Sequence, residues 1–488
     1  QAEDGIRDCL LSRGLGDVYK RQVLVLWMVF FVSCASEGRV VQRASPNFIF
    51  VLVDDQAWNG TSVEMVPGVP ESASDFHQTP WLDSLARKGM RFSNARASAP
   101  VCAPSRYSIQ FGKSPARIQL IRVGMNTSHI PHGEWPSLPR VLHNLDSTYL
   151  AAHFGKWGMG GTPEELGFDV SDGPTKNVDG GFVNDRSQWD TREVADPKHV
   201  FELANRAVRF MDSCHVMKRP FFLQLSHYAV HTNIESTPAS LAHMQTTELG
   251  ERHRHLGMAG MTMDLDASLG ELLAKVDELG LNDNTYVVYM SDNGGTPNIP
   301  GAKKYDKSLN QPLSRGKWDA MDGGLRVPMI VSGPGIPANV ATSAHVWGAD
   351  LLPTFSDLAG GGGEMADSLD GGSFAHILKG AKNIEVKRPN AGMAFHVPYE
   401  NRIALNRAHS AWISGHHKLL KFHDNGEIQL FDLDEDLGEK TNLAAEFPER
   451  ARDMEAELLA YLKQVKAPRW QEGITWKNAP FHSFESTH

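Results

Sequence analysis

Three runs of apolar residues, each ending in a cluster of polar side chains, constrain the fold of this 488-residue chain more than any other feature. They cover residues 47–53, 220–225 and 285–290 and consist mainly of aliphatic and aromatic residues. A short, continuous apolar run of this kind is typical of a strand that is buried on both faces of a parallel sheet. The sequence therefore predicts three central strands.

Helical patterns over 198–212 and 261–279 separate the three runs. Strands that alternate with helices indicate an α/β fold, in which helices sandwich a large, mixed, mostly parallel sheet. Ligands of such folds bind beyond the carboxyl ends of the strands. Because all three polar clusters follow the runs at those ends, we expect the functional site there.

The pattern changes at about residue 394 to short strands followed by one helix. An Asp-Asn-Gly segment at 424–426 is typical of a hairpin turn. We therefore expect a large domain over 45–385 and a smaller C-terminal subdomain over 386–488, in which an antiparallel sheet packs with a helix. The expected elements of this subdomain are strands at 411–414, 418–422 and 427–433 and a helix at 446–465.

The charge balance excludes one large class of partner. The formal net charge is -10, which argues against binding of nucleic acid. Apolar residues make up 41% of the chain, as in an ordinary soluble globular protein. If the substrate is an anion, the positive charge that binds it must be local to a pocket.

The first 22 residues match nothing that follows them. Residues 17–22 resemble an in-frame translation of a sequencing adapter. Our hypothesis is that residues 1–22 are a sequencing artefact, and the alternative is a disordered tail.

Residues 23–32 are a run of apolar side chains that is too short to cross a bilayer as a helix. The run has the length of the apolar region of a signal peptide, and small residues follow it. The sequence therefore predicts a signal over 23–35, export to the periplasm or secretion, and no transmembrane span. Residues 31–34 also resemble a bacterial lipobox, so an outer-membrane lipoprotein anchored through Cys34 is one alternative, and a buried core strand is another.

The cysteines do not form a disulfide framework. Of the four in the chain, Cys9 and Cys34 lie in the segments just described, which leaves Cys102 and Cys214. A secreted protein held together by disulfides has more cysteines than this. Cys102 is therefore available for chemistry.

Cys102 opens a Cys-Ala-Pro-Ser-Arg segment. Pro104 can begin a helix, which would place Cys102 just before the positive helix end and Arg106 about one turn inside it. Such a position lowers the pKa of a thiol and suits an anion. A cysteine nucleophile and a buried structural cysteine both remain open on these residues alone.

Cys102 to Arg106, followed by Gly112-Lys113, resembles the signature of the type I sulfatases. Residues 46–55 and 79–95 are similar to other segments of that family, and the resemblance covers nearly the whole chain after residue 45. It implies an alkaline phosphatase-like fold and the hydrolysis of sulfate esters. It also implies that a formylglycine-generating enzyme oxidises Cys102 to formylglycine, whose hydrated form attacks sulfur and then expels sulfate.

The resemblance implies a metal site formed by formylglycine 102 and by oxygen donors after two of the runs. Carboxylate and amide oxygens suit Ca²⁺, or Mg²⁺ as the second choice. The sequence shows no Cys/His cluster with the spacing of a zinc site. Helix caps and plain turns are the alternative interpretation. The implied ligands are Asp54, Asp55, Asp292 and Asn293.

The resemblance also implies a sulfate pocket built from Lys156, His231 and Lys317, beside Arg106. Positive charge is needed there because negative charge moves onto the sulfuryl and leaving oxygens during hydrolysis. Lys317 or His231 is expected to protonate the leaving alcohol. The alternative for each lysine is a solvated surface charge.

One position departs from the family pattern. Many members have histidine two residues after the lysine of the Gly-Lys-Trp motif, where this chain has Gly158. We interpret the departure as the mark of a subfamily, with His153 as a possible substitute for the missing imidazole.

The C-terminal part resembles bacterial exo- or polysaccharide-type sulfatases, so a sulfated carbohydrate is the expected substrate. His396, Tyr399, Arg402 and His416 are the residues expected to reach the pocket and select the sugar, with a surface loop as the alternative. Three other functions stay open: a phosphonate or phosphate ester hydrolase of the same superfamily, a catalytically silent protein that binds sulfated glycans, and a hydrolase that uses the Cys102 thiol.

Overall fold

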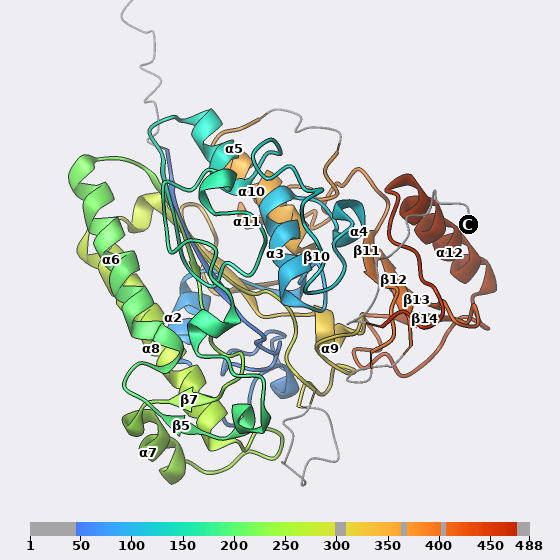
Figure 1. Ribbon diagram of the computed structural model, residues 1–488, viewed down its shortest axis with the longest axis horizontal. Helices are drawn as coiled ribbons and strands as arrows, with labels where there is room; N and C mark the ends of the chain where they lie inside the picture. Colours follow the sequence, from blue (N-terminus) through green and yellow to red (C-terminus); the bar gives the residue numbers. More distant parts are fainter. Residues whose placement is uncertain (1–44, 298–308, 363–367, 402–406, 476–488) are drawn as a thin grey trace, which may run out of the picture. The chain divides into compact units, whose positions relative to one another are not determined.

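An eight-stranded mixed sheet runs through the centre of the molecule (Figure 1). The computed structural model describes residues 45–297, 309–362, 368–401 and 407–475. From one edge to the other the strands are β10 (Val340–Trp347), β2 (Met90–Arg96), β9 (Met329–Ser332), β8 (Thr285–Ser291), β1 (Asn47–Val53), β6 (Phe221–Ser226), β3 (Leu150–Gly155) and β4 (Val170–Ser171). The last five are parallel to one another, and β9 is antiparallel to both of its neighbours.

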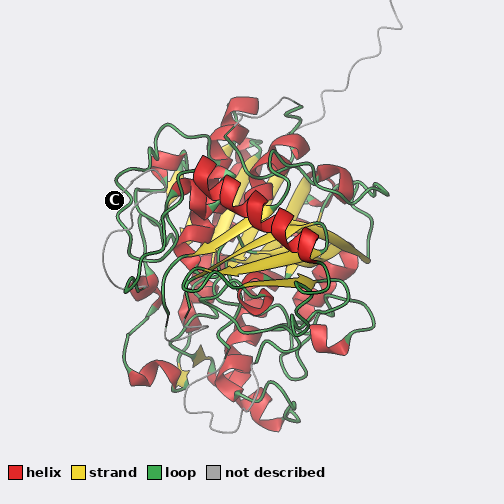
Figure 2. Cartoon of the chain, turned by 90° about the vertical axis from the view of Figure 1, so that its right-hand side faces the viewer, coloured by secondary structure: helices red, strands yellow, loops and turns green. Residues whose placement is uncertain are grey.

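The central strand β1 shows why helices cover both faces. Phe48, Phe50 and Leu52 point into one apolar core, while Ile49 and Val51 point into another on the opposite face. Figure 2 shows the strands with helices around them. The first core is completed by α3 (Cys102–Phe111), α5 (Leu138–Leu145), α10 (Leu351–Leu358) and α11 (Ala375–Leu378), and the second by α2 (Pro80–Lys88), α6 (Val200–Met217) and α8 (Leu256–Glu278).

The strand order brings four carboxyl ends together at one edge. In register, Val53 of β1 lies opposite Ser291 of β8, Leu52 opposite Ser226 of β6, and Ser226 opposite Gly155 of β3. The residues that follow these strands therefore start from neighbouring points. This edge is where the sequence predicts the functional site.

A second, four-stranded antiparallel sheet forms the C-terminal part, with α12 (Pro448–Gln464) packed on it. Its strands are β11 (Met393–Val397), β12 (His409–Ser414), β13 (His417–Phe422) and β14 (Ile428–Asp432), in chain order. The predicted small sheet with one helix is confirmed. The structure adds β11 as an edge strand, and the described residues from 45 onward form one compact unit. The predicted domain boundary at residues 385 and 386 stays a prediction.

A buried ionic network joins the two sheets at α9 (Asp322–Leu325). Asp322 accepts hydrogen bonds from Arg96 of β2 at 2.7 Å, from Arg326 at 2.9 Å and from Lys418 of β13 at 3.1 Å. Lys418 also pairs with Glu439 at 2.6 Å, and both side chains are fully buried. Charged groups from both sheets thus depend on one another for their partners.

The remaining elements are short or lie at the periphery. They are β5 (Arg192–Glu193), β7 (Glu235–Ser236), α4 (Pro115–Ile118), α7 (Pro238–Thr246) and the 3₁₀ turns Pro70–Ser72, Glu164–Leu166, Asn177–Gly180, Arg186–Trp189, Pro197–His199, Asn282–Asn284 and Gly348–Asp350.

Three predictions concern membrane crossing and the first 35 residues. Among the described residues, no helix is long and apolar enough to cross a membrane. The predicted artefact at 1–22 and the predicted signal at 23–35, with Cys34, lie outside the described residues.

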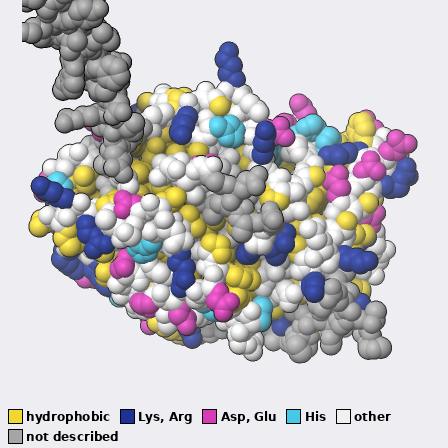
Figure 3. Space-filling model, turned by 90° about the horizontal axis from the view of Figure 1, so that it is seen from above, with side chains coloured by type: hydrophobic (Ala, Val, Ile, Leu, Met, Phe, Trp, Pro, Cys, Tyr) yellow, Lys and Arg dark blue, Asp and Glu magenta, His cyan; other side chains and the backbone are white. Residues whose placement is uncertain are grey.

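On the face in Figure 3, lysines and arginines are interspersed with acidic side chains, and neither sign gathers into one area.

Candidate active site

Four oxygen-donor residues follow the two central strands, and all are buried. Asp54 and Asp55 come directly after β1, and Asp292 and Asn293 come directly after β8. Asp55 has a left-handed backbone (φ 61), which aspartate tolerates better than most residues. Its Oδ1 accepts a 2.8 Å hydrogen bond from Asn293 Nδ2, and its backbone N–H donates to Asp292 Oδ1 at 3.3 Å. The two pairs predicted from sequence therefore meet.

Cys102 lies at the first residue of α3, and Val101 is the N-cap. The prediction that Pro104 opens the helix is wrong, because the helix starts two residues earlier. Cys102 is only 6% exposed and forms no disulfide. Because its backbone N–H belongs to the first helical turn, Cys102 still lies at the positive end of the helix dipole.

Arg106 is one turn further along α3 and is buried with its charge compensated. Its Nε donates to Asp292 Oδ2 at 2.8 Å, and its Nη1 donates to the carbonyl of Lys156 at 2.6 Å. Its Nη2 is buried and has no hydrogen-bond partner in the described part of the chain. A buried guanidinium with an unpartnered NH₂ group is suited to receive an anion.

Two buried lysines complete the charge balance. Lys156, directly after β3, donates to Asp54 Oδ2 at 2.5 Å, and Lys317 donates to Asp55 Oδ2 at 2.6 Å. The alternative that these lysines are solvated surface charges is contradicted, since they are 1% and 5% exposed. Asp54 and Asp55 thus each have a lysine as a partner.

His231 lies beyond β6 on the same edge. Its Nδ1 donates to the carbonyl of Thr232 at 2.7 Å, and its Nε2 lies 3.4 Å from Asn177 Nδ2 and 3.8 Å from Asp55 Oδ2. The carbonyl holds the ring in one orientation, which leaves Nε2 for the site. The neighbouring His227 is fully buried and has no hydrogen-bond partner among the described residues, as expected of a structural histidine.

The charges in this cluster shift several pKa values. Burial raises the pKa of Asp54, but the positive charges led by Lys156 outweigh it and bring that pKa well below its usual range. Burial, with the charge of Asp54, raises the pKa of Asp292 to about 6. Burial, with Lys317, lowers the pKa of His231 to about 4. For Lys317 the attraction of Asp55 outweighs burial and raises the pKa, so its ammonium group stays charged.

The donor set fits a divalent metal. Asp54 Oδ1 and Asn293 Oδ1 are buried oxygens without a hydrogen-bond partner in the described residues. Orphaned oxygens of this kind are costly unless a cation or water satisfies them. Ligand atoms of Asp54, Cys102 and Asp292 also lie within 4.8 Å of one another. Hard oxygen donors of this composition suit Ca²⁺ or Mg²⁺.

Two cavities open next to Cys102, and both have Asn177 in their walls. One, of about 380 Å³, is lined by Lys156, Gly158 and Arg122, and the other, of about 520 Å³, by His231, Lys317 and two tryptophans. Volumes of 300–1,000 Å³ are typical of small-molecule sites. The cluster is therefore accessible to a ligand larger than a single anion.

Gly158, the position that departs from the family pattern, packs closely against two cationic side chains of the site. Its backbone is left-handed (φ +67), and a Cβ atom there would lie 3.2 Å from Lys156 Cε and 3.3 Å from Arg106 Cδ. Any side chain would therefore press on two of the cationic residues. The glycine at position 158 is therefore part of the packing of the site.

Two histidines that the sequence predicts at the site, His153 and His396, do not line either cavity. His153 is fully buried with its Nε2 3.1 Å from Ser226 Oγ, and it packs against Trp157, so it does not line either cavity. His396 is buried in the small sheet, where Nε2 donates to the Pro468 carbonyl and Nδ1 bonds Ser410. With both ring nitrogens hydrogen-bonded, His396 is not available to a substrate.

Three other residues named for sugar selection have different outcomes. Tyr399 is fully buried. His416 lies on the hairpin between β12 and β13 and does not line either cavity. Arg402 lies outside the described residues.

Sequence reasoning missed the residues that line the outer parts of the cavities. Trp189 and Asn177 come from 3₁₀ turns between β4 and α6, a stretch without a periodic pattern. Trp318 follows Lys317 directly, and Arg122 lies in a loop after α4. Only Trp318, next to a predicted site residue, had a signal in the sequence.

Comparisons with known proteins identify the family of this chain. A family model described as "Sulfatase" matches residues 46–361, and one described as "N-sulphoglucosamine sulphohydrolase, C-terminal" matches residues 317–468. Arylsulfatase G of Rattus norvegicus is 26% identical over 88% of this chain and 89% of its own length. N-acetylgalactosamine-6-sulfatase of Canis lupus familiaris is 26% identical over 68% of this chain and 66% of its own.

A solved structure gives the same result for the fold. The crystal structure of Ps i-CgsB in complex with k-i-k-neocarrahexaose has a TM-score of 0.69 and 25% identity, and it covers 87% of this chain and 94% of its own. The alkaline phosphatase-like architecture expected from the sequence is therefore present. Since the first family model covers well over half of the chain, this protein belongs to the sulfatase family and is a sulfuric ester hydrolase.

Proposed function

We propose that this sulfatase removes sulfate from a sulfated carbohydrate, with a formylglycine made from Cys102 as its nucleophile and with Ca²⁺ as its metal. One observation carries the proposal: buried aspartates, cations and two cavities converge on Cys102. The expected metal ligands are Asp54, Asp55, Asp292 and Asn293, together with residue 102.

The modified residue and the metal divide the chemistry. A hydrated formylglycine supplies one hydroxyl to attack sulfur and a second to expel sulfate, and a formylglycine-generating enzyme is the partner that makes it. Calcium supplies positive charge next to the nucleophile and the sulfate group. The side chains of the site are proposed to bind the sulfate group and to supply a proton to the leaving oxygen.

Arg106, Lys156 and Lys317 are proposed to bind and orient the sulfate group. Each is buried and held by a carboxylate or carbonyl, so its position is set before the substrate arrives. Pre-positioned donors of this kind stabilise charge that develops in the transition state, and loss of one typically costs about 3 kcal/mol. The leaving oxygen is proposed to take its proton from Lys317 or His231.

The carbohydrate is proposed to occupy the two cavities. Trp189 and Trp318 line the larger one, and flat aromatic rings suit the apolar face of a sugar ring. Arg122 and Lys176 line the smaller one and place positive charge beside it. This arrangement favours a sulfated sugar that carries a further anionic group. The names of the relatives, which include an N-acetylgalactosamine-6-sulfatase, support a carbohydrate substrate.

Export is proposed from residues 23–35, whose sequence fits a signal peptide. A sulfated polysaccharide outside the cell is consistent with that location.

The proposal is tested by sulfate release from an aryl sulfate and from sulfated sugars. The protein is produced from residue 36 onward together with a formylglycine-generating enzyme. We expect turnover that disappears in Cys102→Ala, falls on treatment with a calcium chelator and returns with Ca²⁺. A matched phosphate and a phosphonate ester should react much more slowly.

Two results would contradict the proposal. Preferred cleavage of the phosphate or phosphonate ester would assign the enzyme to another reaction of the superfamily. An unmodified thiol at residue 102 in active protein, detected by mass spectrometry of its peptide, would exclude the formylglycine.

A further inference from the structure

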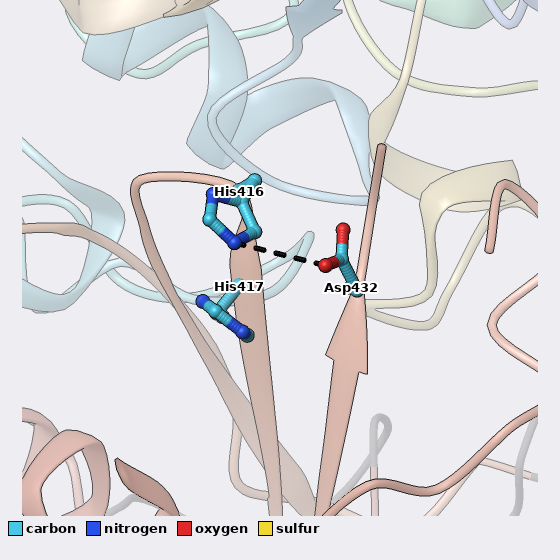
Figure 4. Close-up of side chains that lie close together, drawn as sticks. All are labelled: His416, His417 and Asp432. Atoms are coloured by element: carbon cyan, nitrogen blue, oxygen red, sulfur yellow. Dashed lines mark ion pairs between the residues drawn. The ribbon is translucent and has the colours of Figure 1, made fainter. Parts of the chain in front are cut away.

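The open end of the small sheet holds a second cluster of metal-ligating side chains that the sulfatase reaction does not use. It consists of His416, His417 and Asp432, which we call the hairpin cluster (Figure 4). One ligand atom from each residue lies within 4.8 Å of the other two.

Local geometry explains why three residues from two segments meet there. β12 and β13 are joined by the two-residue turn Gly415–His416, and Gly415 has the positive φ of 61 that the first turn position of a type II′ hairpin requires. His417 pairs directly with Asp432 on β14. Cross-strand partners point to the same face of a sheet, so these two side chains lie together, and His416 reaches them from the turn.

The distances suit a shared metal better than a direct hydrogen bond. His416 Nε2 lies 3.6 Å from Asp432 Oδ2, which is too long for a hydrogen bond. Two ligands of a tetrahedral metal, each about 2.0–2.1 Å from it, lie about 3.3 Å apart. The imidazole rings of His416 and His417 have their centroids 4.1 Å apart, so both nitrogens are within reach of one ion.

The ligand atoms have no other role in the described residues. No hydrogen bond engages a ring nitrogen of His416 or His417 there. Asp432 Oδ1, in contrast, accepts the backbone N–H groups of Asp434 and Glu435 at 3.0 and 3.3 Å. These bonds fix the carboxylate and leave Oδ2 for a cation, as outer hydrogen bonds do in metal sites.

The surrounding charge favours a cation. The charged groups that act on the His417 ring include Asp432, Asp434 and Arg450. Two carboxylates face one guanidinium around the histidines, so the local charge is negative.

We infer that the hairpin cluster binds a divalent transition metal, with Zn²⁺ as the expected ion and water in the fourth position. Two imidazoles and one carboxylate are ligands that Zn²⁺ prefers, whereas Ca²⁺ prefers oxygen donors alone. The ion would link the turn and β13 to β14 at the end of the small sheet where β13 begins and β14 ends. This site is separate from the proposed calcium site and does not depend on the proposed function.

The test is zinc binding to the full chain, saturated with Ca²⁺, measured by equilibrium dialysis. We expect the double variant His416→Ala/His417→Ala to bind one zinc equivalent fewer than the unaltered protein. Asp432→Asn should weaken that equivalent at least tenfold. His215→Ala removes an exposed histidine of α6 and should change nothing.

Two further measurements separate this site from the catalytic centre. Asp54→Asn, which damages the proposed calcium site, should keep the hairpin zinc. Co²⁺ should give the visible absorption of a tetrahedral complex in the unaltered protein and not in the double variant. Equal zinc stoichiometry and affinity in the unaltered protein and the double variant would overturn the inference.

Discussion

At the residue scale, the two groups proposed to protonate the leaving oxygen, Lys317 and His231, differ in a way that kinetics can separate. Lys317 is held by Asp55 and keeps its proton. His231 donates through Nδ1 to the Thr232 carbonyl, and its Nε2 lies 3.4 Å from Asn177 Nδ2. A proton donor matters most for a poor leaving group, while a charge that stabilises sulfate matters for every substrate.

We therefore expect different patterns from His231→Asn and Lys317→Met. The variant that removes the proton donor, whichever of the two residues that is, should lower kcat/KM for an alkyl or sugar sulfate by about 10²–10⁴-fold and affect nitrophenyl sulfate much less. Loss of a charge donor should lower both by about 10²–10³-fold. Parallel losses for both variants on both substrates would mean that neither residue is the donor.

Gly158 gives a second prediction at this scale. An added Cβ would press on Lys156 and Arg106, so Gly158→Ala should lower kcat by at least about tenfold, the effect of a misplaced catalytic group. The matched control is Gly173→Ala, because Gly173 also has a left-handed backbone (φ +78) but nothing within 4 Å of its added Cβ. Both variants bear a similar backbone strain of about 1–2 kcal/mol. Equal kinetics in the two would show that the contact with the cations is unimportant.

At the element scale, the ionic network around Asp322 decides how β13 is attached to the large sheet. Lys418 is fully buried between Asp322 and Glu439, whereas Lys421 of the same strand forms a partly exposed pair with Glu455. Removing one partner from a buried ionic group leaves an uncompensated charge, which is far costlier than losing a surface pair.

We expect Lys418→Met to lower the free energy of unfolding by about 3–5 kcal/mol. Lys421→Met, the same substitution on the same strand, should cost at most about 1 kcal/mol. Denaturant titration of the two variants measures both. Similar values would mean that the network contributes no more than a surface ion pair.

At the scale of the whole molecule, buried histidines make stability depend on pH. Burial lowers the pKa of His77, His153 and His227 to about 3 and of His396 and His409 to about 4. The unfolded chain takes up these protons near the ordinary pKa of about 6.5. Their stabilising contribution is therefore complete above about pH 6.5 and is lost as the pH falls towards 4. Buried carboxyl groups such as Asp266, whose pKa rises to about 7, act in the opposite direction but are fewer among these strongly shifted groups.

The thermal midpoint of unfolding should accordingly fall between pH 7 and pH 5. His396→Asn should reduce the number of protons taken up on unfolding by about one, because one buried imidazole is removed, and the midpoint should then depend less steeply on pH. The exposed His215→Asn should leave the slope unchanged. A midpoint that rises towards pH 5 would contradict the assignment.

The sequence by itself determined the sheet and most of the residues that meet in the candidate site, since both depend on local order along the chain. The run at 47–53 is β1, and the polar residues after three buried runs had to meet once the strands became neighbours. The signature around Cys102 identified the family because its residues are contiguous.

Only the tertiary structure decided which residues share a partner across long separations. His396 was expected at the pocket, yet its strand turns it towards Pro468, 72 residues away. The cavity wall from Trp189 and the pairing of His417 with Asp432 likewise depend on how irregular turns and a strand register place side chains. The spacing of residues along the chain did not reveal the proposed zinc ligands, because the hairpin cluster forms only when three antiparallel strands bring separate segments together. Local periodicity thus predicts the elements, and packing between elements places the ligands.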